Sequence, residues 1–223
     1  MKRKINQKSN PINTFICPNC GNIIYINNQT FLDVTNWPRC RDKLMDLSLF
    51  NKRCTHCGEE VYIEYPIEYM DEKRGFVVLM APGFDEDFLS VVNSAKPEAF
   101  TLGNYHTYRV VPSVEELVEK ILIFESNRDD VVIEVYKVFL RERLKEEWPD
   151  MNPELILYYN KDGDEYFVIW DNVMTPGSEK LTVAFDEEHY NEIIKDFGNS
   201  LKLTDNKKYW VIDEKFILKR VLK

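Results

Sequence analysis

The sequence predicts an α+β fold, and three observations in it support that class. Near the N-terminus, two Cys-x-x-Cys-Gly units each precede a short stretch in which apolar and polar residues alternate. Between residues 113 and 148, apolar residues recur with helical spacing in two consecutive runs. Farther on, two apolar runs flank the turn sequence Lys-Asp-Gly-Asp. We therefore expect a ribbon-like lobe with an elaborated loop, a central helical hairpin with strands, and a C-terminal antiparallel meander with helices.

Length and composition are typical of a soluble globular protein. Hydrophobic residues make up 44% and charged residues 30% of the 223 positions, so disorder is not expected over most of the chain. A chain of this length holds one large domain, or a small domain joined to a medium one. The changes of pattern predict a basic flexible arm at 1–12, the cysteine-bearing lobe at 13–70, a central α+β region at 71–150 and a C-terminal α+β unit at 151–223.

Charge is divided unevenly along the chain. Residues 1–57 hold nine Lys or Arg against three Asp, a balance of +6, and the remainder holds 20 basic and 35 acidic residues, a balance of −15. The net charge of −9 disfavours extensive contact with phosphate backbones. Contact with a nucleic acid through the basic N-terminal lobe stays open as an alternative.

The sequence shows neither a membrane-spanning segment nor a secretory signal, and this bears on the expected cellular compartment. No apolar run approaches the roughly 18–20 residues that a membrane-spanning helix needs. The basic N-terminal stretch is not followed by an apolar segment, so it does not resemble a secretory signal. We therefore expect a cytoplasmic protein without membrane contact.

Four of the five cysteines form two matching units, "CPNCG" and "CTHCG". Two cysteines three positions apart on a tight turn can point at one ion, and the following glycine accepts the positive φ of that turn. Two such turns facing one another make a tetrahedral four-sulfur site, which suits zinc. We therefore expect one structural zinc ion per chain, with the ligands Cys17, Cys20, Cys54 and Cys57.

The sequence gives less support to two other interpretations of these cysteines, a redox dithiol and disulfide bonds. A redox dithiol precedes a helix, whereas Gly21 and a β-branched run follow the first unit. Disulfides are disfavoured by the expected cytoplasmic location and by the odd number of cysteines. His56 lies between two ligands and is expected to point away from the ion. The fifth cysteine, Cys40, is expected to be a partly buried thiol rather than a reactive group or an alternate ligand.

The spacing of the two units departs from a compact ribbon. Thirty-three residues separate Cys20 from Cys54, more than the about 15–20 that are common. The insert contains "RDKLMDLSLF", which predicts a short helix with Leu44 and Leu47 on one face. The ribbon is therefore expected to carry an elaborated loop that leaves its ligands unchanged.

A family resemblance supports the metal site. The stretches "TFICPNCG", "RDKLMDLSLFNKRCTHCG" and "IEYPIEYMDEKRGFVVLMAP", followed by "YRVVPSVEELVEKILIFESNRDDVVIEVYK", resemble the CpXC domain family of prokaryotic proteins. The resemblance covers roughly residues 13–145, and it departs from the family signature in the second unit, which lacks the proline that Pro18 supplies in the first. It implies the ribbon and its metal, and it implies no activity.

Strands and helices alternate in the central region. Ser113 is expected to cap a helix, with Glu116 as the partner in a capping box. A second helix begins at Asn127 or Asp129 and ends before Pro149, and its polar residues are expected to form a solvated face. The short turn between these helices predicts an antiparallel hairpin. The remaining expected elements are strands in 75–83 and 106–111 and a short helix around 88–92.

The C-terminal segment predicts a meander followed by helices. Gly163 supplies the unusual φ of the first hairpin turn, and Gly198 is expected to end a helix. The expected elements are strands at 154–160, 165–172, 180–185 and 208–213, a turn at 175–178, and helices at 186–200 and 214–223.

No catalytic or cofactor-binding motif is recognisable. His106 lies between Tyr105 and Tyr108 on a predicted strand, where a structural role is favoured over that of a general base. His189 is expected on a solvated helix surface. The paired Asp129 and Asp130 are expected to cap a helix, "DGD" at 162–164 fits a hairpin turn better than a calcium loop, and no nucleotide-binding loop is present.

Three functions remain after these exclusions. The favoured one is a non-catalytic module that binds another protein and carries a structural zinc ion. The first alternative is an enzyme with a cleft around Tyr105, His106 and Tyr108, in which zinc is only a scaffold. The second alternative is nucleic-acid contact through the basic ribbon.

Overall fold

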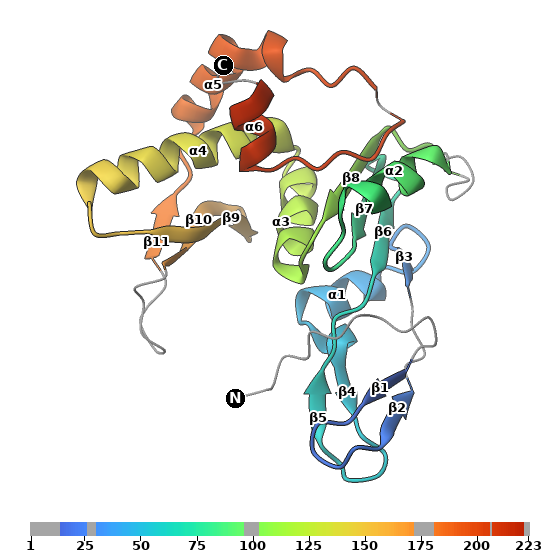
Figure 1. Cartoon of the computed structure of the whole chain (residues 1–223). Helices are drawn as coiled ribbons and strands as arrows, with labels where there is room; N and C mark the ends of the chain where they lie inside the picture. Colours follow the sequence, from blue (N-terminus) through green and yellow to red (C-terminus); the bar gives the residue numbers. More distant parts are fainter. Residues whose placement is uncertain (1–13, 26–29, 96–102, 172–180, 206, 221–223) are drawn as a thin grey trace.

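The computed structural model describes residues 14–25, 30–95, 103–171, 181–205 and 207–220 (Figure 1). It confirms the mixed α+β class: several small sheets alternate with helices along the chain. The expected arm at 1–12 and the expected turn at 175–178 lie outside the described residues. Among the helices of the described part, none combines the length and apolar character that crossing a membrane requires.

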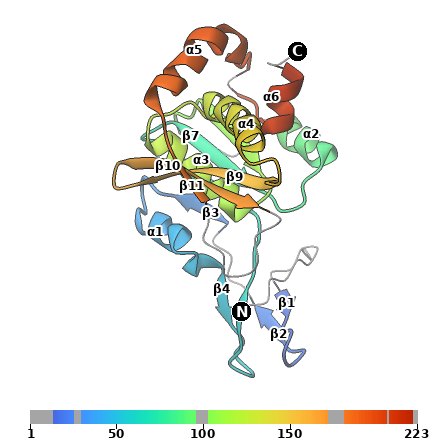
Figure 2. The same cartoon turned by 90° about the vertical axis from the view of Figure 1, so that its left-hand side faces the viewer.

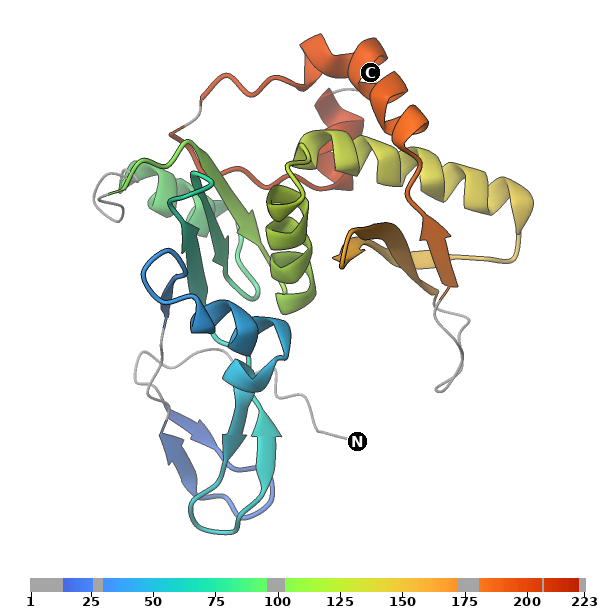
Figure 3. The same ribbon diagram turned by 180° about the vertical axis from the view of Figure 1, so that it is seen from behind.

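The N-terminal lobe consists of two small antiparallel hairpins at one end of the molecule (Figures 1 and 3). In each hairpin, the second strand follows directly from a Cys-x-x-Cys-Gly turn, as the sequence predicts. Phe15 and Ile24 face each other across the first hairpin and are buried, whereas their neighbours in the strands are more exposed. The four strands are β1 (Thr14–Ile16), β2 (Ile23–Tyr25), β4 (Asn51–Arg53) and β5 (Glu60–Tyr62).

The insert between the hairpins folds into α1 (Arg39–Met45) and a 3-10 turn, η1 (Ser48–Phe50). Leu44 is fully buried, as the predicted helix requires. The expectation that Leu47 shares its face was wrong: Leu47 lies beyond the helix with φ of 59° and is 38% exposed. The left-handed residue turns the chain, so the next buried apolar residues are Leu49 and Phe50.

A four-stranded sheet lies next to the N-terminal lobe and contains the parallel pairs β3–β6 and β7–β8 around the antiparallel pair β6–β7. Alternate residues of its central strand face opposite layers: Val78 belongs to the main core on one side and Val77 to a second cluster on the other. Since β6 runs across position 70/71, the expected boundary there falls inside a strand, and the domain division stays a prediction. The strands are β3 (Phe31–Asp33), β6 (Ile67–Asp71), β7 (Phe76–Met80) and β8 (Thr107–Val111).

Helices cover both faces of this sheet. The longer of them, α3 (Val114–Glu125), packs against β7, and the side chain of Ser113 accepts a hydrogen bond from the Glu116 N–H at 3.2 Å, as the capping prediction requires. On the other face, α2 (Glu86–Ser94) contributes apolar residues to the second cluster. The four-stranded sheet is therefore a central layer between two helical ones.

The second central helix, α4 (Asp130–Glu147), is capped by Asp129, whose side chain accepts a hydrogen bond from the Val131 N–H at 2.8 Å. Asn127, with φ of 54°, turns the chain between α3 and α4. Figure 1 shows that α4 begins at the upper end of α3 and runs sideways toward the C-terminal sheet rather than back alongside α3. The two helices predicted on either side of the short turn are thus present, but the expectation that they pack antiparallel was wrong.

Charged side chains link β8, α3 and α4 inside the molecule. The Arg109 guanidinium donates two hydrogen bonds to Asp130, each 2.7 Å long. The Lys120 Nζ lies 3.2 Å from an Asp130 oxygen and 3.0 Å from a Glu134 oxygen. These four side chains are at most 7% exposed, so their charges are balanced by each other and not by water.

Lys137 continues this network to a third carboxylate. Its Nζ lies 2.9 Å from Glu134 and 3.0 Å from Glu119, and Glu119 also accepts a hydrogen bond from the Tyr158 N–H of the C-terminal sheet. The expectation that the polar residues of α4 form a solvated face was therefore wrong for its first turns. We call these six residues the buried ion chain: Arg109, Asp130, Lys120, Glu134, Lys137 and Glu119.

The C-terminal unit is a three-stranded antiparallel meander with two helices, as predicted. Asp162 and Gly163, with φ of 56° and 98°, form the tight turn of its first hairpin. In Figure 2 the meander lies below α4, with α5 and α6 on the far side of that helix. The elements are β9 (Pro153–Lys161), β10 (Asp164–Asp171), β11 (Leu181–Ala184), α5 (Glu187–Leu201) and α6 (Glu214–Arg220).

Two details of the C-terminal prediction were wrong. Gly198 lies inside α5, because the helix continues until it buries Leu201. The expected strand at 208–213 is only a single bridge to β8, made by the backbone of Trp210. Tyr209 instead turns its ring onto the sheet, where its hydroxyl donates a 2.5 Å hydrogen bond to Glu68.

Candidate metal centre

Both Cys-x-x-Cys-Gly units fold into the same backbone turn. In the first, the Cys17 N–H donates to the Asn22 carbonyl at 2.8 Å and the Gly21 N–H donates to the Cys17 carbonyl at 2.9 Å. The second unit repeats these bonds at the same two lengths, from Cys54 to Glu59 and from Gly58 to Cys54. Two short segments of different sequence thus adopt one conformation, which points both cysteines of each turn to one side.

Glycine is required in each turn by the backbone. Gly21 has φ of 74° and Gly58 has φ of 78°, in the left-handed region that side-chain-bearing residues rarely adopt. An added Cβ at Gly21 would meet no atom within 4 Å, so the requirement comes from the dihedral angle and not from crowding. The glycine that follows each second cysteine in the sequence is therefore part of the site.

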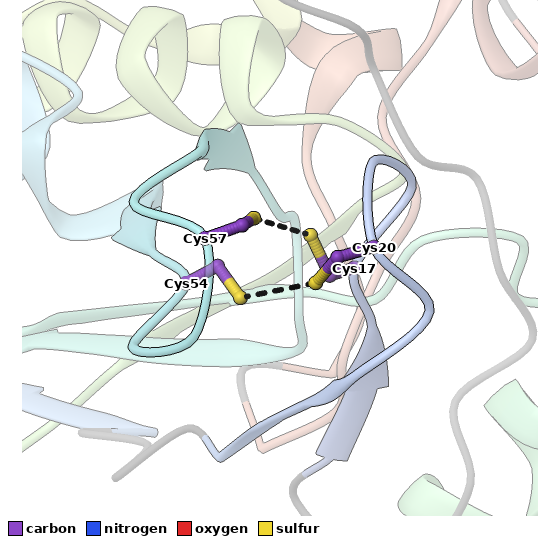
Figure 4. Close-up of side chains that lie close together, drawn as sticks. All are labelled: Cys17, Cys20, Cys54 and Cys57. Carbon is purple, nitrogen blue, oxygen red and sulfur yellow. Dashed lines mark hydrogen bonds between the residues drawn. The ribbon is translucent and has the colours of Figure 1, made fainter.

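The two turns bring four sulfur atoms together (Figure 4). The Sγ atoms of Cys17 and Cys57 lie 3.6 Å apart, those of Cys20 and Cys54 lie 3.8 Å apart, and all four lie within 4.8 Å of one another. A tetrahedral ion with metal–sulfur bonds of about 2.3 Å requires sulfur–sulfur separations of about 3.8 Å. No disulfide joins these cysteines. The cluster could therefore hold one metal ion.

Hydrogen bonds to the sulfurs favour their thiolate forms unevenly. The backbone and side chain of Asn22 lower the pKa of Cys20 to about 6, and the N–H groups of Cys57 and His56 lower the pKa of Cys54. Burial raises the pKa of Cys17 to about 11 in the absence of a cation. A bound cation would offset that cost, because it stabilises the thiolate directly.

The cluster lies between the small core of the lobe and solvent. Cys17 and Cys54 are buried, at 1% and 2% exposure, and pack with the apolar core, whereas Cys57 is exposed. His56 is exposed and does not belong to the ligand group found in the described residues. Cys40 is buried in α1, away from the four sulfurs. The four ligand candidates named from the sequence are thus the ones that the fold brings together.

Chemically, this arrangement suits a structural ion. Four thiolates complete a tetrahedral shell and leave no position for a reacting water, which a catalytic metal requires. Backbone N–H donors at the sulfurs reduce the repulsion among four negative ligands. The ion would then join the two hairpins, since each contributes two sulfurs.

The residues of the alternative catalytic cleft do not meet in one place. His106 is exposed and lines a cavity of about 590 Å³ together with Asp129 and Asp130, and its Nδ1 lies 3.1 Å from the Thr107 hydroxyl. Tyr105 and Tyr108 belong instead to the apolar cluster on the other face of the sheet. Strict alternation would place His106 and Tyr108 on one face, but β8 begins only at Thr107, so His106 lies before the regular part of the strand.

An exposed apolar face on the first hairpin was not singled out from the sequence. Ile16, Ile23 and Tyr25 are 55%, 52% and 77% exposed, and Ile16 and Ile23 are direct partners across the two strands. The alternation of β2 contains the signal, because Ile24 between Ile23 and Tyr25 is the buried residue. An apolar strand face without cover in the described structure is a common feature of protein-binding surfaces.

Comparison with known proteins supports the family resemblance. The comparisons with curated proteins and with solved structures gave no match. A family model described as "CpXC protein" matches residues 15–137, from the strand before the first cysteine turn to the middle of α4. Because that match spans more than half of the chain and includes all four clustered cysteines, the chain belongs to the CpXC protein family.

Proposed function

We propose that this protein is a non-catalytic, protein-binding module of the prokaryotic cytoplasm, in which one structural zinc ion holds the N-terminal lobe together. The closed four-sulfur cluster is the observation that carries the proposal. Zinc is the favoured metal because tetrahedral thiolate sites suit it, and a closed shell leaves it no reacting water. The ion then acts on the fold of the lobe and not on a substrate.

The first hairpin supplies the proposed contact surface. Its strands are joined to the cluster through Cys17 and Cys20, and its outer face presents Ile16, Ile23 and Tyr25. A tyrosine flanked by two aliphatic side chains is typical of the centre of a protein-binding surface. The metal would keep that face in a single shape, so binding of the partner protein would depend on it.

A binding experiment tests this proposal. The zinc-loaded chain is used to capture a partner protein, and Tyr25→Asp and Ile23→Asp are expected to abolish capture while one zinc per chain is retained. Trp148→Asp is the matched control, because Trp148 is 48% exposed at the C-terminal end of α4, outside the first hairpin, and the substitution should leave capture unchanged. Equal capture by all three variants would contradict the assignment of the hairpin as the contact surface.

A second candidate function is catalysis in the cavity that His106 lines. The observation that favours it is the exposure of this imidazole in a cavity with Asp129, whose pKa burial raises. A screen of ester and phosphate-ester hydrolysis compares the wild type with His106→Asn and, as a control, with His189→Asn on α5. Turnover lost only in His106→Asn would favour catalysis, and equal turnover in both variants would oppose it.

Nucleic-acid contact through the basic lobe is the third candidate. It draws on the charge balance of +6 in residues 1–57, against −15 in the rest of the chain. Electrophoretic mobility of DNA and RNA at low and moderate salt tests it, because phosphate contacts weaken steeply as salt rises. The absence of a shift at low salt would remove this candidate.

A further inference from the structure

A cavity of about 560 Å³ lies between the family-matched part of the chain and its C-terminal part. Its walls come from the end of β8, from α3 and α4, from β9, and from residues 211–218. Cavities of about 300–1,000 Å³ at such junctions commonly hold small organic molecules. Figure 1 shows α6 lying against α4, where it closes one side of this region.

Much of the cavity wall is apolar. The aliphatic side chains come from β8, α4, β9 and residues 211–218, whereas α3 contributes only charged side chains. An apolar group inside would therefore contact several aliphatic side chains at once. Leu218 of α6 is 47% exposed and stands among the lining residues. Other lining aliphatic residues are Val111, Val138, Leu155, Ile156 and Ile212.

The charged part of the wall has an excess of carboxylates. The lining residues include six acidic and four basic side chains. Three of the basic ones already have acidic partners: Lys120 and Lys137 within the buried ion chain, and Arg141 at 3.2 Å from Glu214. The fourth, Lys215, is exposed. Six carboxylates against four cations leave an excess of negative charge among the lining residues.

Among these carboxylates, Glu116 is the one best placed to pair with a cation bound in the cavity. It projects from α3 one turn before the Glu119 and Lys120 of the ion chain, and it is half-buried. Its Oε2 accepts a 2.7 Å hydrogen bond from the Ser113 hydroxyl, and no ion pair involves it in the described part of the chain. Burial raises its pKa, and the Ser113 hydroxyl and the charges of Lys137 and Lys120 oppose that shift only in part. A cation at this position would relieve that cost.

We propose that this cavity binds a small organic amine, with the ammonium group beside Glu116 and the hydrocarbon part against Val138 and Ile156. The ammonium pairs with Glu116, for which the described residues show no direct ion pair, and the aliphatic walls take the hydrocarbon chain out of water. An organic anion would meet the same carboxylates and be repelled. A bare metal ion would leave the apolar walls without a contact. This site depends neither on the zinc ion nor on the first hairpin.

Matched ligands test the proposal on the unaltered, zinc-loaded chain. Hexylamine, hexanol, sodium hexanoate and magnesium chloride are each titrated by calorimetry and by thermal melting. Hexylamine is expected to bind with a Kd of roughly 1 mM or below, and to raise the melting temperature by about 3 °C at ten times that Kd. The other three ligands are expected to bind at least about tenfold more weakly.

Two neighbouring glutamates then separate this site from general surface charge. Glu116→Gln keeps the size of the side chain and is expected to weaken hexylamine binding about tenfold, with hexanol unaffected. Glu115→Gln on the same turn of α3 is the control, because Glu115 does not line the cavity, and it should change nothing. Hexanoate binding as tightly as hexylamine, or equal losses in both variants, would overturn the proposal. So would the absence of hexylamine binding to the wild type at about 10 mM.

Discussion

The N-terminal lobe and the body of this protein are stabilised in different ways. Each strand of the lobe's two hairpins has three residues, and the two hairpins are not joined into one sheet. The body has a four-stranded sheet between helices, with α3 buried along most of its length. Two-stranded hairpins are marginal in water, whereas a sheet packed between helices buries enough apolar surface to be stable.

Because of this difference, the cysteine sulfurs of the lobe and the charged side chains inside the body have different roles. In the lobe, four sulfurs converge where an apolar core is too small, and an ion from outside the chain is expected to complete the structure. In the body, the buried ion chain balances three cations with three carboxylates that the chain itself supplies. The lobe should therefore respond to metal supply and chelators, and the body should not.

Loss of a ligand should produce the largest difference between the two regions. Cys17→Ser or Cys57→Ser is expected to remove the metal and to unfold the lobe, because zinc bound by four cysteines contributes on the order of 10 kcal/mol. Elemental analysis and limited proteolysis measure the two effects, and cleavage should fall within the lobe while the body stays intact. Cys40→Ala is the matched control and should retain one zinc per chain. A Cys17→Ser variant that retains one zinc per chain and full protease resistance would contradict this prediction.

Breaking the buried ion chain should destabilise the body and leave the metal site of the lobe unchanged. Lys120→Met leaves Asp130 and Glu134 without one of their cations, which is expected to cost about 3–5 kcal/mol of unfolding free energy. Urea denaturation followed by circular dichroism measures that loss, with the zinc content unchanged. Replacing Glu134 by Leu in the same chain should restore part of the stability. A Lys120→Met protein as stable as the wild type would show that these charges are not coupled.

Glycine substitutions sharpen the comparison at a smaller scale. Gly21→Ala forces a side-chain-bearing residue to φ of 74° and is expected to destabilise the metal-bound lobe by about 1–2 kcal/mol, seen as roughly tenfold weaker zinc binding in competition with a chelator. Gly198→Ala in α5 should have the opposite sign, because alanine favours a helix interior by about 1 kcal/mol. A loss of stability in both variants would count against this account of Gly21.

On acidification, the lobe should lose its metal at a higher pH than the one at which the body unfolds. Zinc binding requires thiolates, so protons compete with the metal and the lobe should release it as the pH falls from about 6 to 4. In the body, burial opposes the charge of Asp130, but Arg109 and Lys120 lower its pKa below the ordinary value. The stability from this depressed pKa is present above about pH 4 and is lost only as the pH falls through the lower, folded value. Zinc release measured with a chromogenic chelator should precede loss of helical circular dichroism, and the reverse order would contradict the comparison.

The parts of this fold that the sequence predicts correctly depend on neighbours in the chain. The cysteine turns can be recognised because Gly21 and Gly58 each follow a Cys-x-x-Cys unit, and the caps at Ser113 and Asp129 because each accepts a hydrogen bond from a residue two or three positions on. The four-sulfur cluster then follows from pairing two identical turns. Local chemistry alone suffices for these elements.

What the sequence does not predict depends on contacts between distant segments. Lys120 and Glu134 resemble ordinary surface residues in the sequence, and only the crossing of α3 and α4 makes them an internal pair. Trp210 meets β8 at Arg109, about a hundred positions earlier, so a local pattern of alternation suggested a longer strand than the single bridge that forms. Propensity describes a residue's neighbours in the chain and carries no information on these partners.

The bridge between Trp210 and β8 also bears on the order in which the protein can fold during synthesis. All four cysteines of the lobe have been made once Cys57 has been added, so the cluster could bind a metal ion before β8 is made. The outer edge of β8 stays without this bridge until Trp210, about a hundred positions later in the chain, leaves the ribosome. The nascent chain thus carries a completed N-terminal lobe beside an open sheet edge, and that edge is the surface that a chaperone would have to shield.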